Sequence, residues 1–354
     1  MGAASYFAKK ITVLVITLLI ASYLTILIAN MGGFIDDMIK SMLLEDITIE
    51  VKRNPQYRNL PPVEQKKIID AIYEVRIKQK GLDKPFIERS LIYLVDALSL
   101  NLGRAMFLTS DTGSRNVRDI IIERLPVTVM LFTTATVLNF ILGLLLGIYI
   151  SMRPGSLLDK FVIFAAVVFS VIPAWFYGIF MILIFASTLR LFPYGGLVSV
   201  PPPEDPVMYF LDMLWHMALP LMTWVMVGIT PTAYGTRNLV LQTATEDFVM
   251  VAKAKGLPER LIRNRYIIRP SLPPIITNFS LAVIGSWTGA IISERVFNWP
   301  GLGTLIYQAI EALDAPVIIG VSVVYAYLLV FTVLFLDIIY SYVDPRIRAM
   351  IRGG

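Results

Sequence analysis

The sequence predicts an all-α polytopic membrane protein with six transmembrane helices. The chain of 354 residues is 56% hydrophobic and only 16% charged, its mean hydropathy is +0.69, and its apolar residues gather in six long runs. A soluble domain averages about 45–50% apolar and about 25% charged residues. A single globular core of this size cannot enclose such an excess, which argues against a soluble cytosolic enzyme.

Each of the six runs is long enough to cross the hydrocarbon core of a bilayer, which takes about 20 residues. In chain order, the expected spans are Ile11 to Met31, Val127 to Ser151, Phe161 to Leu189, Met217 to Val240, Pro274 to Ile292 and Val317 to Val343. The first run is longer than the apolar region of a usual signal peptide and has no clear small-x-small cleavage site. We therefore expect it to remain as a span.

Between the first two spans lies a polar stretch of 95 residues, 32–126, with 15 basic and 14 acidic residues. Proline in a first turn, in Pro61-Pro62-Val63-Glu64, and glycine after a last turn predict a helix that Gly81 closes. A second, amphipathic helix is expected from Phe86 to Leu100. The apolar content is too high for a disordered linker. Because long loops cross the membrane largely regardless of their charge, we expect a folded helical cap on the outer side.

The charge of the short loops predicts the orientation, because cytoplasmic loops carry an excess of Lys and Arg. With the N-terminus in the cytoplasm, the inner segments hold 14 basic and five acidic residues, and the two short outer loops hold two basic and six acidic residues. Both termini of this multi-pass protein of the cell membrane are thus expected inside. The predicted organisation is a cytoplasmic N-terminus with the first helix (1–31), an extracytoplasmic helical cap (32–126), a five-helix core (127–343) with a cytoplasmic loop (241–273), and a cytoplasmic tail (344–354).

The sequence offers little catalytic or metal-binding chemistry. It has no cysteine, which excludes disulfides and thiolate metal sites, and one histidine, His216. An intramembrane serine protease needs a serine beside a histidine base, and an aspartyl protease needs two intramembrane acids, of which only Asp337 is clear. We expect no enzyme, no catalytic residue and no metal site. A secondary transporter or channel, which usually shows internal repeats and broken helices, and an intramembrane protease stay as alternatives.

The expected cytoplasmic loop contains two short helices with the features of a docking surface. Acidic residues begin the first helix at Glu246, lysines lie near its end, and Gly256 permits the left-handed turn that closes it. Pro258 then begins a second, basic helix that leads back to the membrane. Small alanines in the first helix allow a partner to approach closely. Composition alone leaves an ordinary charged loop as the alternative.

The same loop resembles the coupling motif of ABC importer permeases of the dipeptide/oligopeptide/nickel family, the inner-membrane components of binding-protein-dependent transport systems. The resemblance lies in Glu246-Asp247-Phe248 followed by Ala252-Lys253-Ala254-Lys255-Gly256-Leu257. Further segments resemble that family in the same order along the chain: Gly81 to Pro85, Asn101 to Arg104, Glu123 to Thr128, Ser170 to Trp175, Asn298 to Gly303 and Asp344 to Arg346.

The resemblance implies the type I ABC importer permease fold and implies that the chain is one subunit of a larger transport complex. The implied partners are a second homologous permease subunit, two cytoplasmic ATPase subunits and an extracytoplasmic substrate-binding protein. The chain has no Gly-x-x-x-x-Gly-Lys phosphate loop, so ATP and magnesium are expected on the ATPase subunits, with no cofactor in this chain. The residues assigned to ATPase coupling are Glu246, Asp247, Ala252, Lys253, Ala254, Lys255, Gly256 and Leu257.

Two further sets of residues are candidates for functional contacts. The candidates for the pathway or gate are Pro173, Trp175, Phe176, Ser286 and Trp287. The candidates for docking of the binding protein are Glu294, Arg295, Phe297, Pro300, Gly301 and Gly303. Fixed helix kinks and simple re-entry geometry are the respective alternatives. Glycines spaced by four, at Gly143/Gly147 and Gly285/Gly289, permit close helix packing, either with a partner subunit or within the chain.

Two departures from the family pattern bear on the substrate. The general coupling motif begins with Glu-Ala-Ala, and here Met250-Val251-Ala252 holds that place. After the first span, Met31 to Asp37 replaces a more usual Pro-Gly-Asp-Pro. A subset of the family that imports oligosaccharides is similar there, so the substrate is left open between oligopeptides and oligosaccharides.

Overall fold

The computed structural model describes residues 3–30 and 33–343, and this part of the chain is helical without a β-strand. It forms two compact units. The first, which we call the insertion unit, comprises Lys10–Glu123 and Gln308–Val330, and the second, the core unit, is built mainly from Arg124–Tyr307. The expected all-α class is confirmed. The tail expected at 344–354 lies outside the described residues.

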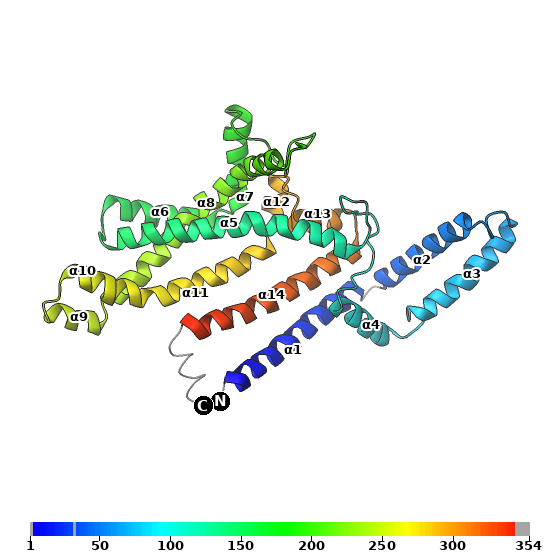
Figure 1. The fold of residues 1–354 in the computed structure, drawn as a ribbon, viewed down its shortest axis with the longest axis horizontal. Helices are drawn as coiled ribbons and strands as arrows, with labels where there is room; N and C mark the ends of the chain where they lie inside the picture. The colour runs from blue at the N-terminus through cyan, green and yellow to red at the C-terminus, as the bar shows by residue number, and fades with distance from the viewer. Residues whose placement is uncertain (1–2, 31–32, 344–354) are drawn as a thin grey trace. The chain divides into compact units, whose positions relative to one another are not determined.

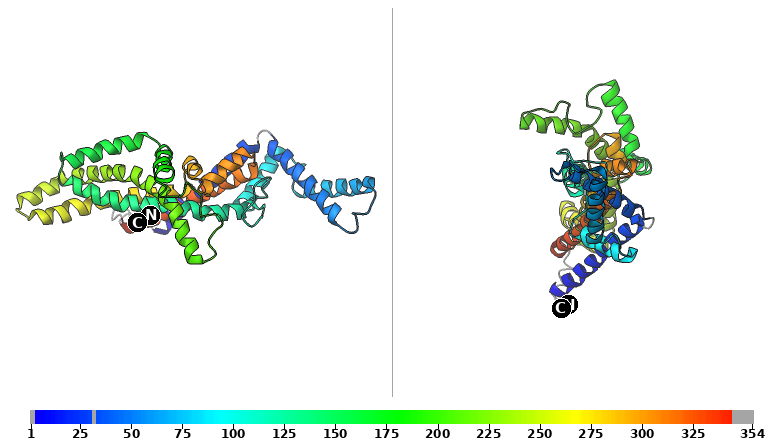
Figure 2. Two further views of the ribbon diagram at one scale, coloured as in Figure 1. Left: turned by 90° about the horizontal axis from the view of Figure 1, so that it is seen from above. Right: turned by 90° about the vertical axis from the view of Figure 1, so that its right-hand side faces the viewer.

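The N-terminal part of the chain forms four helices: α1 (Ala3–Asn30), α2 (Phe34–Arg53), α3 (Pro62–Gln79) and α4 (Phe86–Leu98). Helices α2 and α3 lie side by side as a hairpin (Figure 1, Figure 2), and an ion pair joins Arg76 of α3 to Glu50 of α2. The helix expected to open at Pro61-Pro62 is confirmed, with Pro62 as its first residue, and Gly81 follows its end with a φ of +65°.

Buried carboxylates tie the parts of the insertion unit together. Asp36 at the start of α2 is 3% exposed, accepts a 2.9 Å hydrogen bond from Tyr93 Oη and pairs with Arg89, both of α4. Asp314 Oδ2 accepts three backbone N–H groups, from residues 106–108, at 2.9 to 3.1 Å. These contacts give the segment between the first two spans a defined structure.

The rest of the described chain continues as helices of varied length. They are α5 (Val117–Ser151), α6 (Leu157–Val171), α7 (Ala174–Met181), α8 (Pro206–Ala244), α9 (Asp247–Ala254), α10 (Glu259–Leu261), α11 (Arg269–Gly285), α12 (Ile291–Val296), α13 (Leu302–Glu311) and α14 (Ala315–Val343). Short π-helical segments occupy Ile182–Thr188 and Ile262–Ile268, and a 3₁₀ turn occupies Ser286–Thr288.

Five helical segments of the described chain are long and apolar enough to cross a membrane: Ala8–Asn30, Val117–Ser151, Pro206–Ala244, Glu259–Thr288 and Ala315–Phe335. The expected third span is instead a pair of helices, Leu157–Val171 and Ala174–Thr188, bent by 99°. Pro173 lies at the bend, and Ile172 before it has extended backbone with φ −93° and ψ 127°. Proline disfavours helical backbone in the residue before it. The expected total of six is reached when the bent pair is counted as one broken span.

The fifth expected span, 274–292, is displaced toward the N-terminus. The helix already begins at Glu259 and ends at Thr288. Hydropathy did not reveal this beginning because the first turns are rich in arginine. At the other end, Gly289 has a φ of +66°, a backbone conformation that a helix cannot continue through.

Helices α5, α6 and α8 of the core unit pack closely. A Cβ added at Gly147 of α5 would lie 2.6 Å from Thr236 Cβ of α8, so no larger residue fits between the two helices. The pair Gly143/Gly147 therefore serves packing within this chain. At the start of α6, Asp159 is 1% exposed and forms a two-point ion pair with Arg237 of α8. This pair fixes α6 against α8.

Candidate functional site

The segment assigned to coupling folds as the short helix α9 with one buried face. Val249 and Ala252 are 0% and 2% exposed and pack against Ile262 of the following helical segment. Leu257 and Tyr266 complete this small apolar cluster. Because the anchor lies on one side of α9, the other side is free to meet another molecule. Figure 1 shows α9 beside α10 where the chain passes from α8 to α11.

The free side of α9 carries apolar rather than charged side chains at its centre. Phe248, Met250 and Val251 are 44%, 55% and 53% exposed; we call them the α9 face. Lys253 and Lys255 are exposed at the end of the helix. Exposed apolar residues rimmed by polar ones are typical of an interaction surface.

Gly256 ends α9 in the manner expected from the sequence. Its φ is +68°, and its N–H donates to the Lys253 carbonyl while the Leu257 N–H donates to the Ala252 carbonyl. These two bonds form a Schellman motif, in which the left-handed position favours glycine. The motif turns Leu257 back onto Ala252 and so orients α9 relative to the next helix.

The helix after α9 runs without interruption into the membrane. Residues of α10, the π-helical segment Ile262–Ile268 and α11 form one candidate span, Glu259–Thr288. The cluster around Ile262 therefore links α9 directly to the start of a span. A displacement of α9 would be carried into this helix because packed helices move as stiff bodies.

A second polar site follows that span, around Glu294 of α12. Its side chain is 0% exposed and accepts hydrogen bonds from Thr128 Oγ1 of α5 at 2.8 Å and from the Thr304 N–H of α13 at 3.0 Å. The described chain places no basic side chain in an ion pair with it. Burial raises the pKa of Glu294 to about 7, and the hydrogen bonds lower it in part. The buried Glu294 carboxylate thus links α12 to α5 and α13 by hydrogen bonds, and we call Glu294, Thr128 and Thr304 the Glu294 bracket.

Three glycines leave the space that the Glu294 carboxylate occupies. Added Cβ atoms would lie 2.7 Å from Glu294 Oε1 at Gly289 and 3.0 Å from Oε2 at Gly303, and at Gly301 would meet Thr128 Oγ1 and Glu294 Oε2. Thr128 Oγ1 also accepts the Leu302 N–H at 2.7 Å. The Pro-Gly-Leu-Gly turn is therefore shaped around the buried acid.

The residues predicted to dock a binding protein are mostly interior. Glu294, Phe297, Gly301 and Gly303 are buried, and Pro300 is half-buried. Arg295 is exposed and its guanidinium lies over the Tyr307 ring, 5.0 Å from the ring centroid. Within this set, a docking contact rests chiefly on Arg295, and it stays a prediction.

The predicted pathway residues lie in two separate segments. Pro173, Trp175 and Phe176 lie at the bend between α6 and α7, where Phe176 is exposed and its ring contacts Phe180 at 5.0 Å. Ser286 and Trp287 form the 3₁₀ turn after α11, where Ser286 Oγ lies 3.0 Å from Thr133 Oγ1 of α5 and Trp287 stacks on Phe331 at 6.3 Å. The described contacts do not join the two segments, so a shared pathway role stays a prediction.

Sequence reasoning gave no role to three residues that hold these sites. Thr128 enters the sequence analysis only within the segment Glu123 to Thr128. Its position at the start of an expected span was a signal that its hydroxyl bonds to a buried polar group. Asp159 and Arg237 belong to the charges that predict the orientation, and the sequence predicts no further role for them. An acid and an arginine at the ends of neighbouring apolar helices were the signal for their pairing. In the part of the chain that the structure describes, no group of His, Asp and Glu is placed to hold a metal.

Comparison with known proteins identifies the family. Residues 117–349 match the family described as "Binding-protein-dependent transport system inner membrane component". The chain is 30% identical over 285 residues, 80% of its length and 87% of the other, to the oligopeptide transport system permease protein AppB of Bacillus subtilis (strain 168).

Two further relatives are similar over comparable lengths. A protein named probable D,D-dipeptide transport system permease protein DdpB, of Escherichia coli (strain K12), is 32% identical over 300 residues, 80% of this chain and 86% of the other. The peptidoglycan transport system permease protein YejB of Agrobacterium fabrum (strain C58 / ATCC 33970) is 29% identical over 276 residues, 76% of this chain and 74% of the other. The relatives are named as permease proteins of transport systems, and the family description states that transport depends on a binding protein. The chain therefore belongs to the family of binding-protein-dependent transport system inner membrane components and is a multi-pass permease subunit of an ABC importer.

Proposed function

We propose that the chain forms half of a translocation pathway for short peptides and that ATP hydrolysis reaches it through α9. The peptide assignment rests on the relatives, whose names specify oligopeptide, D,D-dipeptide and peptidoglycan transport. These names favour peptides over the oligosaccharides that the segment after the first span also suggested.

The observation that carries the coupling proposal is the α9 face. Phe248, Met250 and Val251 are exposed on a helix whose other side is anchored to the start of a membrane span. An ATPase subunit that covers these three side chains removes apolar surface from water, which stabilises the complex. The two lysines at the end of the helix suit acidic groups at the edge of such a contact.

The proposed assembly contains a second homologous permease subunit, two ATPase subunits and a binding protein on the outer side. The ATPase subunits hold ATP and magnesium, and this chain holds no cofactor. Both termini and α9 lie in the cytoplasm in this proposal, in line with the basic residues of that loop. The segment between the first two spans then lies outside the membrane.

Transport in this proposal follows alternating access. Closure of the ATPase dimer displaces α9, and the cluster around Ile262 passes the displacement to the helix Glu259–Thr288. The break at Pro173 leaves carbonyl groups without intrahelical donors and makes α6 and α7 separate bodies. We assign this break, together with Trp175 and Phe176, to the moving part of the pathway.

The test is uptake by proteoliposomes that contain the complete importer and its binding protein. We expect ATP-dependent accumulation of a tripeptide and no accumulation of a trisaccharide of similar mass. Uptake must vanish when the binding protein is left out. Accumulation of the trisaccharide alone would contradict the peptide assignment, and peptide uptake without ATP would contradict the coupled mechanism.

A further inference from the structure

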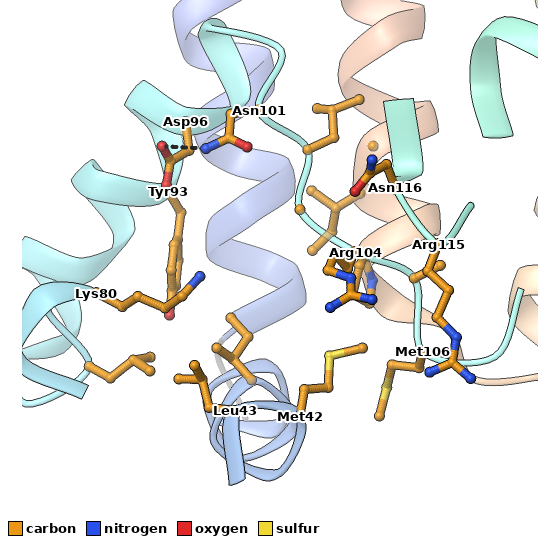
Figure 3. Close-up of a pocket in the computed structure, with 18 of the residues that line it drawn as sticks. Met42, Leu43, Lys80, Tyr93, Asp96, Asn101, Arg104, Met106, Arg115 and Asn116 are labelled. Atoms are coloured by element: carbon orange, nitrogen blue, oxygen red, sulfur yellow. Dashed lines mark hydrogen bonds between the residues drawn. The ribbon is translucent and has the colours of Figure 1, made fainter. Parts of the chain in front are cut away.

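The insertion unit contains a cavity that the proposed transport mechanism does not use. Its volume is about 900 Å³, within the range typical of small-molecule sites. Residues of α2, α3 and α4 and of the loop 101–116 line it, together with the ends of α1 and α14. Figure 3 shows Lys80, Tyr93 and Asp96 on one side of this space and Arg104 and Arg115 on the other.

Two of the basic side chains at the cavity have no ion-pair partner in the described chain. Of the four lining cations, Arg76 pairs with Glu50, and Arg104 pairs with Asp46 at 3.0 Å. Lys80 and Arg115 have no acidic partner among the described residues. Both side chains are exposed, and cations without an acidic partner at a cavity favour a ligand that carries an anionic group.

Negative charge is present as well and is also unpaired. Glu45 and Asp96 line the cavity, and neither forms an ion pair with a basic side chain of the described chain. Asp96 Oδ1 accepts a hydrogen bond from Asn101 Nδ2 at 3.2 Å, which fixes the direction of the carboxylate. Free acids and free bases that do not neutralise one another suit a ligand with both charges.

The floor of the cavity is apolar. It includes Ile26 of α1, Ala97 of α4 and Ile319 of α14, which belong to one buried cluster. Leu43 and Met42 of α2 add apolar surface, as Figure 3 shows. An apolar floor with a charged rim selects a ligand whose charges lie at its ends and whose middle carries hydrocarbon.

We propose that this cavity binds a short peptide by its two free termini. The peptide carboxylate lies at Arg115 and its ammonium group at Asp96, on opposite sides of the cavity, and its side chains lie on the floor formed by Ile26, Ala97 and Ile319. A lone phosphate or carboxylate would leave the two acids unused. The inference rests on the proposed peptide function and adds a second peptide site, on the permease itself.

The experiment measures binding of a leucine-rich tripeptide to the permease–ATPase complex in nanodiscs without the binding protein. The tripeptide is used in free, N-acetylated and C-amidated forms. We expect saturable binding of the free peptide and at least about tenfold weaker binding of each blocked form, since each loses one charge-assisted contact. This comparison uses the wild-type chain and does not depend on the folding of a variant.

Two double variants assign the contacts. Lys80→Gln with Arg115→Gln should weaken binding of the free peptide about tenfold and leave the amidated form unchanged. Glu45→Gln with Asp96→Asn should weaken the free peptide and leave the acetylated form unchanged. The control is Arg53→Gln with Asp70→Asn, which removes two exposed charges of α2 and α3 away from the cavity; it should bind as the wild type does.

Three results would overturn the inference: no saturable binding of the free tripeptide, equal affinity for all three peptide forms, or equal affinity of the variants. A phosphatidylethanolamine molecule that co-purifies and is lost only in the double variants would also overturn it, with a lipid as occupant. Failure of this site is distinct from failure of the proposed function, because peptide uptake with the binding protein is measured separately.

Discussion

Replacing Gly256 by valine should abolish the stimulation of ATP hydrolysis by substrate-loaded binding protein. Gly256 has a φ of +68°, where a residue with a Cβ is strained by about 1–2 kcal/mol and a β-branched one is a clear outlier. The strain is relieved by unwinding the turn. That change moves Leu257 from Ala252 and releases α9 from the helix that enters the membrane.

The matched control is Gly256→Asn, because asparagine tolerates the left-handed region. No atom lies within 4 Å of a Cβ added at this position, so size alone does not distinguish the two variants. We expect the asparagine variant to retain most of the stimulation and the valine variant to show basal hydrolysis or loss of the ATPase subunits on purification. Normal stimulation in the valine variant would show that this turn does not transmit the signal.

Replacing Gly301 by alanine should cause the largest loss of stability of the conservative changes considered. An added Cβ would clash with Thr128 Oγ1 and Glu294 Oε2. Thr128 Oγ1 donates to Glu294 Oε1 and accepts from the Leu302 N–H, and Glu294 Oε2 accepts from the Thr304 N–H. Overpacking of a core costs about 1–3 kcal/mol, and a broken hydrogen bond to a buried group costs about 1–3 kcal/mol more. We expect a lower thermal unfolding temperature of the purified importer.

Gly285→Ala is the control for this change. Gly285 also ends a helix of the core unit, but nothing lies within 4 Å of a Cβ added there, and alanine favours helix over glycine. Its unfolding temperature should equal or exceed that of the wild type. Equal unfolding temperatures for Gly301→Ala and the wild type would contradict the claim that the hydrogen bonds of the Glu294 bracket stabilise the core unit.

Much of this architecture could be predicted from composition and spacing. Membrane spans can be predicted from the local sequence alone, because the thickness of the bilayer sets the length of the apolar run. The end of α9 was predictable for a similar reason, since the glycine signal at Gly256 acts within one turn. Both predictions depend on local chemistry.

The errors arose where distant parts of the chain decide the structure. Glu294 was expected on an outer surface because it follows a span in a turn-rich loop, but its side chain is buried and accepts a hydrogen bond from Thr128, 166 positions away. The expected third span was apolar throughout, and hydropathy does not report the 99° bend at Pro173. The basic helix after Pro258 was predicted, but its arginines hid from hydropathy that it is continuous with the fifth span.

The cavity of the insertion unit was beyond sequence reasoning for the same cause. Its charged residues come from three helices and a loop, and nothing in their order along the chain places Lys80 opposite Arg115. The near balance of basic and acidic residues in this stretch gives no sign of a ligand site. Only the fold shows that two cations and two acids surround one space without pairing.

The most direct measurement of the central claim is cross-linking from α9 to the ATPase subunits. The chain has no cysteine, so Val251→Cys introduces a single thiol on the α9 face, which can be labelled with a short photoactivated cross-linker. Val249→Cys, on the buried side of α9, and Val63→Cys, 69% exposed in the insertion unit, are the controls. We predict capture of an ATPase subunit from position 251 alone. Absence of capture from position 251, or equal capture from position 63, would contradict the role of α9 as the point where ATP hydrolysis drives transport.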